Sequence, residues 1–156
     1  MSCEETVRSA DYDRYVAALF APANLRPHLF ALYAFNYEIA KTAETVSQPI
    51  AGQIRLQWWR DAMGELCAGK TRDHPVVRAL GEAMREHDLP QVLFDGMIDA
   101  REMDLEEMPF PDMANLEAYA DATSGNVMRL AARILGAGDR LDPARLSRRA
   151  LAEAVA

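Results

Sequence analysis

Cysteine and basic residues are both scarce in this sequence. Its only cysteines are Cys3 and Cys67, and neither belongs to a Cys-x-x-Cys pair. The sequence therefore offers neither a disulfide framework nor a cysteine-based zinc cluster. Lys and Arg number 17 against 24 Asp and Glu, which gives a formal net charge of −7. A chain with this balance is not expected to bind nucleic acid or to adhere strongly to an anionic membrane surface.

Long hydrophobic runs are also missing. The apolar stretch that begins at Leu29 is interrupted by Glu38 and Lys41, well short of the roughly 18 residues that would indicate a membrane-spanning helix. The N-terminal residues, MSCEETVRSADYD, are acidic and polar, unlike a signal peptide or an Arg-rich transit peptide. We therefore expect a cytoplasmic, bacterial protein that makes at most peripheral contact with the inner membrane.

What the sequence does contain is helical periodicity. Half of its 156 positions are apolar, which is enough for one domain with a core. No segment alternates with the period of two that indicates a strand, so the expected fold class is all-α. Asn24 is the expected N-cap of the second helix. Apolar residues at steps of three and four, with Pro and Gly at the breaks, predict helices over residues 11–21, 24–46, 49–68, 75–88, 92–105, 115–134 and 143–156.

The most distinctive segment of the second helix is YAFNYEIAKTAE, which begins at Tyr33. It resembles the first aspartate-rich helix of the squalene and phytoene synthases, in which Tyr-Ala-(Phe/Trp)-Cys-Arg precedes an Asp-x-x-x-Asp pair. When the two are aligned on Tyr33, Tyr37 stands at the family's arginine. Ala40 and Glu44 stand at the two aspartates. Only one of the two acids of this motif is therefore kept.

Two further segments carry the same resemblance. FDGMIDAREMDLEEM, residues 94–108, is similar to the family's Glu-Gly-Met-x-Met-Asp-Leu, and YADATSGNVMRLAARILG, residues 119–136, to its Tyr-x-x-x-x-Ala-Gly-x-Val. The resemblance covers residues 11–136, about the N-terminal half of such a protein. It implies a truncated helical bundle of the isoprenoid synthase type, with residues 1–156 as a single, partial domain. The helix expected at 143–156 carries no stop signal, which also favours a chain that has been cut.

One branch of the family is a closer match than the synthases themselves. RLQWW, residues 55–59, together with Asn36 and Glu38, resembles the complex I assembly factor of mitochondria and its bacterial relatives, which are regarded as not catalysing prenyl transfer. This implies a non-catalytic protein with a lipid-binding or scaffold role, whose partners are subunits of respiratory complex I. The alternative is a Mg²⁺-dependent prenyltransferase that condenses two prenyl diphosphates head to head. Loss of an arginine and an aspartate that would hold the diphosphate favours the first interpretation.

The resemblance also implies a cavity for an isoprenoid or another lipid between the helices. No residue is expected to be catalytic, and none is expected to bind a metal. A cofactor, Mg²⁺, is expected only under the prenyltransferase alternative. Tyr33 and Ile39 are expected to face inward. The residues expected to line the cavity are Tyr33, Asn36, Tyr37, Ala40, Glu44, Asp99, Glu102, Asp104 and Tyr119.

Two other patterns permit competing interpretations. Residues 64–71, GELCAGKT, satisfy the phosphate-loop formula, but a predicted helix precedes them where a phosphate loop requires a strand, so a nucleotide site is not expected. Asp95 and Asp99 are four residues apart on a predicted helix and could bridge Mg²⁺. A solvated acidic face, paired with Arg101, is the interpretation that we favour.

The aromatic and imidazole side chains give no diagnostic spacing. His28, His74 and His87 are not spaced as ligands on one helix, and each is expected to be structural. Trp58 and Trp59 are adjacent, so in a helix they point about 100° apart and only one can be fully in the core.

Overall fold

The structure of the chain, a computed structural model, describes residues 1–106 and 109–137. Within these residues every regular element is helical and none is a strand, which confirms the all-α prediction. The helix expected over residues 143–156 lies outside this part of the chain. The elements are α1 Cys3–Ala10, α2 Tyr12–Leu19, α3 Arg26–Ala40, α4 Thr42–Thr45, α5 Pro49–Cys67, α6 Pro75–His87, α7 Gln91–Ala100, the 3-10 turn η1 Met103–Leu105, α8 Met113–Ala120, the π-helical turn η2 Asp121–Gly125 and α9 Asn126–Ile134.

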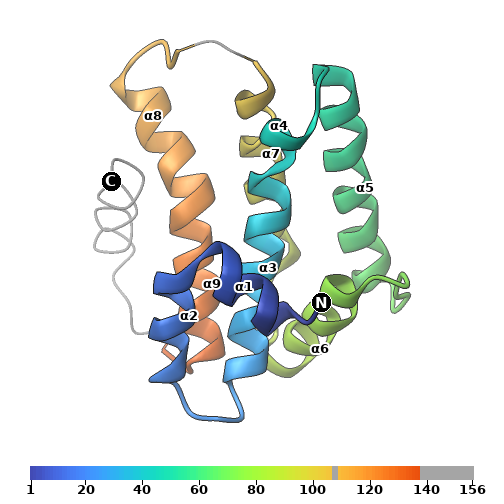
Figure 1. Cartoon of the computed structure of the whole chain (residues 1–156), viewed down its shortest axis with the longest axis vertical. Helices are drawn as coiled ribbons and strands as arrows, with labels where there is room; N and C mark the ends of the chain where they lie inside the picture. The colour runs from blue at the N-terminus through green and yellow to red at the C-terminus, as the bar shows by residue number, and fades with distance from the viewer. Residues whose placement is uncertain (107–108, 138–156) are drawn as a thin grey trace.

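Helix α3 runs through the middle of the molecule, with α5 on one side and α8 and α9 on the other (Figure 1). It is apolar on nearly all sides, as a central helix must be. Phe35 of α3 packs edge to face against Trp59 of α5 and Phe94 of α7, with ring centroids 5.4 and 5.5 Å away. Trp59 is buried while Trp58 is only partly so, as their adjacency predicts. The buried residues of α3 are Leu29, Phe30, Ala31, Leu32, Ala34, Phe35 and Ile39.

The N-terminal region differs from the prediction. Hydrophobic spacing does not reveal α1, yet Ser2 and Glu5 form a capping box at its start. The Ser2 hydroxyl accepts a hydrogen bond from the Glu5 backbone N–H, and the Glu5 carboxylate accepts one from the Ser2 backbone N–H. The prediction of Asn24 as the N-cap of α3 is wrong, because Leu25 occupies that position without a side-chain cap.

The middle helices end where the Pro and Gly signals place them. Helix α5 begins at Pro49, and its C-terminal end is followed by Gly69 at a φ of +78°, a conformation that glycine adopts without strain. Helix α6 begins at Pro75 and ends before Asp88. The residues that satisfy the phosphate-loop formula are the end of α5 and the loop after it. A helix precedes them, as predicted, so they lack the strand that comes before a phosphate loop.

Helices α8 and α9 are continuous through the π-helical turn between them (Figure 1). Helix α8 starts two residues before the predicted position, because the Asp112 carboxylate accepts a hydrogen bond from the Asn115 backbone N–H at 2.8 Å. In the π turn, Thr123 Oγ1 donates to the Tyr119 carbonyl at 2.7 Å. Among the described helices, none combines the length and the apolar character needed to cross a bilayer.

Candidate functional site

The predicted cavity residues on α3 are Tyr33, Asn36, Tyr37 and Ala40, and all four are partly exposed. Tyr33 packs against the hydrophobic core, and the Arg14 guanidinium lies 5.8 Å from the centroid of its ring. Ile39, on the same helix, is fully buried. Neither Tyr33 nor Ile39 points to solvent, as the inward-facing placement requires. That these residues line a ligand cavity stays a prediction.

Charge pairs surround the position of the missing first aspartate. Lys41, next to Ala40, places its Nζ 2.6 Å from Glu38 Oε1. The same ammonium lies 4.7 Å from the centroid of the Tyr37 ring, close enough for a cation–π contact. Arg55 of α5 approaches the other Glu38 oxygen at 3.9 Å. The first motif therefore presents cations paired with one carboxylate, where a synthase would present two carboxylates free to bind metal.

Arg60 of α5 contacts two of the predicted residues at once. Its Nε donates to Asp99 Oδ1 at 2.9 Å, and its Nη2 donates to Glu102 Oε1 at 2.6 Å. Burial opposes the charge of Arg60, but the two carboxylates outweigh burial and raise its pKa. The predicted pairing of Asp99 with Arg101 is wrong, because the packing of α5 against α7 brings Arg60 to Asp99 from 39 residues away. No local spacing signals such a contact.

Arg101 instead joins Asp104 to Tyr119. Its Nη1 donates to Asp104 Oδ2 at 3.1 Å and to Tyr119 Oη at 2.6 Å, while the Tyr119 hydroxyl donates to Asp104 Oδ1 at 2.7 Å. Burial, opposed by Arg101 and supported by Asp104, raises the pKa of Tyr119 to about 12. Arg101 Nε is buried and has no hydrogen-bond partner among the described residues. The three side chains connect the end of α7 and η1 to α8.

The four predicted acids therefore do not converge. Two share Arg60, one is held by Arg101, and Glu44 is exposed on α4. In residues 1–106 and 109–137, the side-chain group close enough to hold a metal contains none of these four acids. Asp95, the competing candidate beside Asp99, is partly buried, and this burial raises its pKa. Because Mg²⁺ requires several oxygens directed at one point, these residues do not fit a paired-aspartate Mg²⁺ site.

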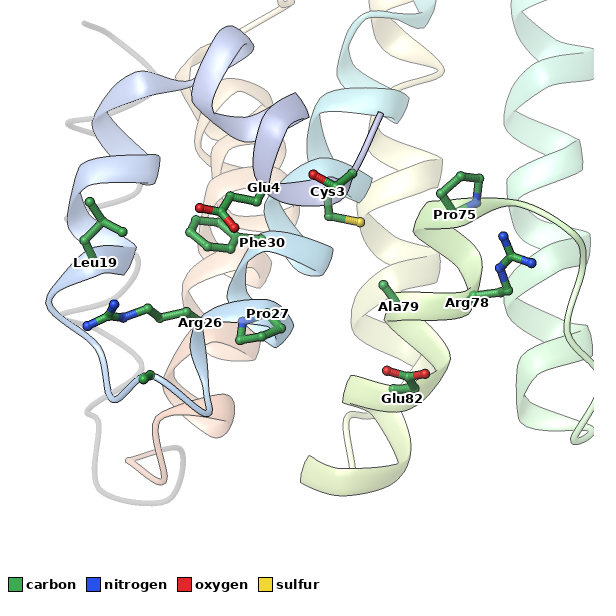
Figure 2. A pocket seen from close by; sticks show the side chains of 12 residues that line it. Cys3, Glu4, Leu19, Arg26, Pro27, Phe30, Pro75, Arg78, Ala79 and Glu82 are labelled. Carbon is green, nitrogen blue, oxygen red and sulfur yellow. The ribbon is translucent and has the colours of Figure 1, made fainter.

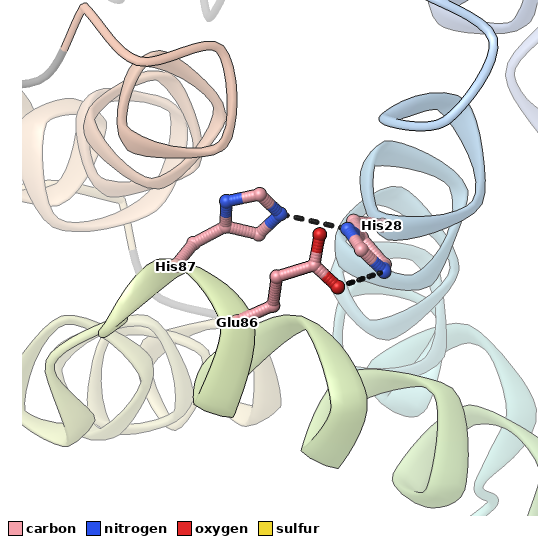
Figure 3. Close-up of side chains that lie close together, drawn as sticks. All are labelled: His28, Glu86 and His87. Carbon is pink, nitrogen blue, oxygen red and sulfur yellow. Dashed lines mark hydrogen bonds and ion pairs between the residues drawn. The ribbon is translucent and has the colours of Figure 1, made fainter.

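Two of the three histidines meet between α3 and α6. His28 Nδ1 and His87 Nε2 are 2.7 Å apart, and Glu86 Oε2 lies 3.6 Å from His28 Nε2 (Figure 3). Sequence spacing gives no sign of the contact between His28 and His87, because it joins residues 59 positions apart. Burial, followed by the charge of His28, lowers the pKa of His87. His74 fits the structural expectation, because its ring packs against both tryptophans of α5 at 5.4 and 5.3 Å.

Two cavities lie away from most of the predicted residues. A cavity of about 650 Å³ opens between the N-terminal helices, α3 and α6, with Cys3, Phe30 and Ala79 in its wall (Figure 2). None of the nine predicted residues lines it. A second cavity, of about 470 Å³, lies beside α4 and the start of α5, and of the nine it includes Asp104.

Comparison with known proteins gives consistent matches. A profile described as Squalene/phytoene synthase matches residues 7–155. The chain is 34% identical over 137 residues to "NADH dehydrogenase (ubiquinone) complex I, assembly factor 6" of Bos taurus, covering 88% of this chain and 41% of that protein. It is 25% identical over 118 residues to phytoene synthase of Rhodobacter capsulatus, covering 76% of this chain and 35% of that protein.

The fold has a close counterpart among solved structures. Squalene synthase HpnC from Alicyclobacillus acidocaldarius superposes with a TM-score of 0.80 at 26% sequence identity, over 96% of this chain and 54% of that one. The predicted isoprenoid synthase fold is thereby confirmed. The chain spans about half, or less, of the length of the relatives that it matches.

Proposed function

Because the chain belongs to the squalene/phytoene synthase family, we propose that this protein is a non-catalytic member of it that acts in the assembly of respiratory complex I. The relative with 34% identity carries that role in its name. The name of that relative supports the proposed partner, complex I. The geometry of the acidic side chains supports the proposed lack of catalysis.

The observation that carries the proposal is that arginines hold the acids of the second segment. Joining two prenyl diphosphates begins with departure of an allylic pyrophosphate, which must be stabilised by cations that carboxylates hold in place. Arg60 binds Asp99 and Glu102, and Arg101 binds Asp104. A carboxylate paired in this way already has its charge compensated, so binding Mg²⁺ would require breaking the pair.

The first motif supports the same conclusion. Ala40 has no oxygen to offer, and Tyr37 has no positive charge for a diphosphate. Lys41 directs its ammonium at Glu38 and at the Tyr37 ring. The residues present therefore do not reproduce the charge pattern that ionisation of the substrate demands.

The remaining parts of the proposal concern ligand, partner and place. We propose that the protein binds an isoprenoid or another lipid beside Tyr33 and Tyr119, and that it contacts complex I subunits. We further propose a bacterial, cytoplasmic pseudoenzyme at the periphery of the inner membrane.

The catalytic alternative is tested by incubating the complete gene product with farnesyl or geranylgeranyl diphosphate and Mg²⁺, followed by extraction of apolar product. The expected result is no product above the level of a heat-denatured control. A bona fide squalene synthase, assayed in parallel, shows that the substrates and extraction are sound. Product formation at a comparable rate would overturn the non-catalytic proposal.

The assembly role is tested in cells from which the gene has been deleted. The expected result is a loss of NADH:ubiquinone oxidoreductase activity and of assembled complex I on native gels, restored by the wild-type gene. The matched control is a gene encoding Glu44→Gln, which removes the last acid of the first motif and should restore assembly equally well. Normal complex I in the deletion strain would contradict the assembly role and leave the lack of catalysis to be judged by the first assay.

A further inference from the structure

A group of metal-ligating side chains lies outside the predicted cavity. His28 is in the first turn of α3, while Glu86 and His87 are in the last turn of α6. Figure 3 shows the three side chains directed toward one another across the gap between the two helices. One nitrogen from each imidazole and one carboxylate oxygen lie within 4.8 Å of one another. Ala40, at the other end of α3, is about 18 Å away along the helix axis.

We propose that His28, Glu86 and His87 form a binding site for a divalent late first-row transition-metal ion, of the class that includes Zn²⁺. Imidazole nitrogen is a preferred ligand for these metals, whereas Mg²⁺ and Ca²⁺ select sites made of oxygen. Two imidazoles and one carboxylate give three protein ligands, which leaves a further position for water.

The distances are compatible with such an ion after a small rearrangement. His28 Nδ1 and His87 Nε2 are 2.7 Å apart, which is a hydrogen-bond distance. Two nitrogens at Zn–N distances of about 2.0–2.1 Å in tetrahedral geometry are about 3.4 Å apart. The rings therefore have to separate by about 0.7 Å, which side-chain rotation alone can supply. Each neutral ring then turns one lone pair to the ion and keeps its single N–H on the other nitrogen.

The surroundings hold the ligands in place while leaving access from solvent. The site bridges α3 and α6, whose packing surfaces are part of the hydrophobic core. The His28 side chain is only 12% exposed, whereas Glu86 is 58% exposed. A cavity of about 410 Å³ opens beside them, with Glu82 and Arg85 in its wall. Glu82 adds negative charge at the entrance, and Arg85 directs its Nε to the Gly81 carbonyl.

The direct test is titration of the complete gene product, free of any histidine tag, with Zn²⁺ by calorimetry and with Co²⁺ by visible spectroscopy. We expect one Zn²⁺ per chain at this site, a Co²⁺ d–d band and a rise in melting temperature, because the ion binds the folded state. His28→Gln, His87→Gln and Glu86→Gln should each raise the Kd at least about tenfold, since even loss of a group behind a metal ligand costs that much. Circular dichroism of each variant without metal verifies that it is folded.

Matched controls separate this site from other metal-binding groups. Glu82→Gln removes a carboxylate one turn earlier on α6, from the wall of the same cavity, and should change the Kd by less than about threefold. Cys3→Ser with Cys67→Ser removes both thiols and should leave the Co²⁺ spectrum unchanged. Absence of Zn²⁺ binding, or equal weakening by Glu82→Gln and Glu86→Gln, would overturn the proposal. Neither result bears on complex I assembly or prenyl transfer, which are tested separately above.

Discussion

Two nitrogens of Arg60 on α5 contact the same oxygen of Asp99 on α7. Arg60 Nε lies 2.9 Å and Nη2 lies 2.8 Å from Asp99 Oδ1. The same Nη2 lies 2.6 Å from Glu102 Oε1. One guanidinium therefore pairs with two of the acids predicted to line the cavity. The contact also connects α5 to the end of α7. Its contribution to the free energy of unfolding can therefore be measured.

Replacing Arg60 by Gln should lower the free energy of unfolding by about 0.5–1 kcal/mol, because its partners are half exposed and solvent screens the pair. Arg60 itself is 23% exposed, against 63% for Asp99 and 50% for Glu102. Arg78→Gln is the matched control, since Arg78 and its partner Asp73 are 59% and 92% exposed and should contribute nothing measurable. Urea denaturation checks both variants, and equal losses would show that the Arg60 contacts have no special role.

Replacing Tyr119 by Phe removes the hydroxyl between Arg101 and Asp104. We expect a loss of about 1–2 kcal/mol, because both partners are partly buried and one hydrogen bond is to a charged group. Leu116→Ala, on the same helix and half-buried, serves as a control for a loss of packing that leaves the hydrogen bonds intact. Urea denaturation at neutral pH is the measurement, and an unchanged midpoint for Tyr119→Phe would show that the hydroxyl is dispensable.

The same residue should be visible in alkaline titration. Its pKa is raised from 10.0 to about 12 by burial, opposed by Arg101 and supported by Asp104. A raised pKa means that the neutral hydroxyl is favoured in the folded state, so its contribution to stability is complete below about pH 10 and declines as the pH rises toward 12. The absorbance of tyrosinate should include a late-titrating phase in the wild type. That late phase should vanish in Tyr119→Phe, and its persistence would assign it to another tyrosine.

His74 should make stability fall on mild acidification. Burial lowers its pKa from 6.5, with Glu38 opposing and Lys41 assisting. Its Nδ1 is buried and has no hydrogen-bond partner in the part of the chain that the structure describes. The unfolded chain therefore takes up the proton first, so the contribution is complete above about pH 6.5 and is lost as the pH falls through the lowered pKa. Urea midpoints between pH 7 and 5 should fall more steeply in the wild type than in His74→Phe. Parallel curves would show that His74 is not the group responsible.

Much of the fold can be predicted because its signals are local. Pro49 and Pro75 start helices, and Gly69 follows the end of one, since these residues restrict or extend the backbone whatever surrounds them. Helix α1 could also be predicted from the local sequence, because Ser2 and Glu5 have the spacing of a capping box. Hydrophobic periodicity alone is too weak in eight residues to reveal it.

The candidate site is harder to predict because its contacts are not local. Arg60 reaches Asp99 over 39 positions, and His28 reaches His87 over 59. Whether an acid stays free to bind metal depends on which cation the packing of two helices brings to it. The sequence shows that Asp99 is present but does not show its partner, because Arg60 lies on another helix.

Magnesium with pyrophosphate should leave the melting temperature of the unmodified chain unchanged, with no Mg²⁺ binding below about millimolar concentration. Ala40 offers no ligand, and Lys41 beside it keeps a positive charge next to Glu38, which weakens attraction of a cation. Glu44 is exposed on α4 and is not part of the described group of side chains close enough to hold a metal.

Restoring the family pattern with Ala40→Asp and Tyr37→Arg should be required before Mg²⁺ and pyrophosphate raise the melting temperature. Two carboxylates would then be four residues apart across the junction of α3 and α4, with a cation three residues before the first to hold the diphosphate. Thermal melts of the unmodified chain, of each single variant and of the double variant, with and without the additions, make the comparison. Mg²⁺ and pyrophosphate could instead stabilise the unmodified chain clearly, with Glu44→Gln abolishing the effect. That result would place a functional diphosphate site in this segment, because a single exposed carboxylate would then be sufficient to hold the metal. The non-catalytic proposal would then fail.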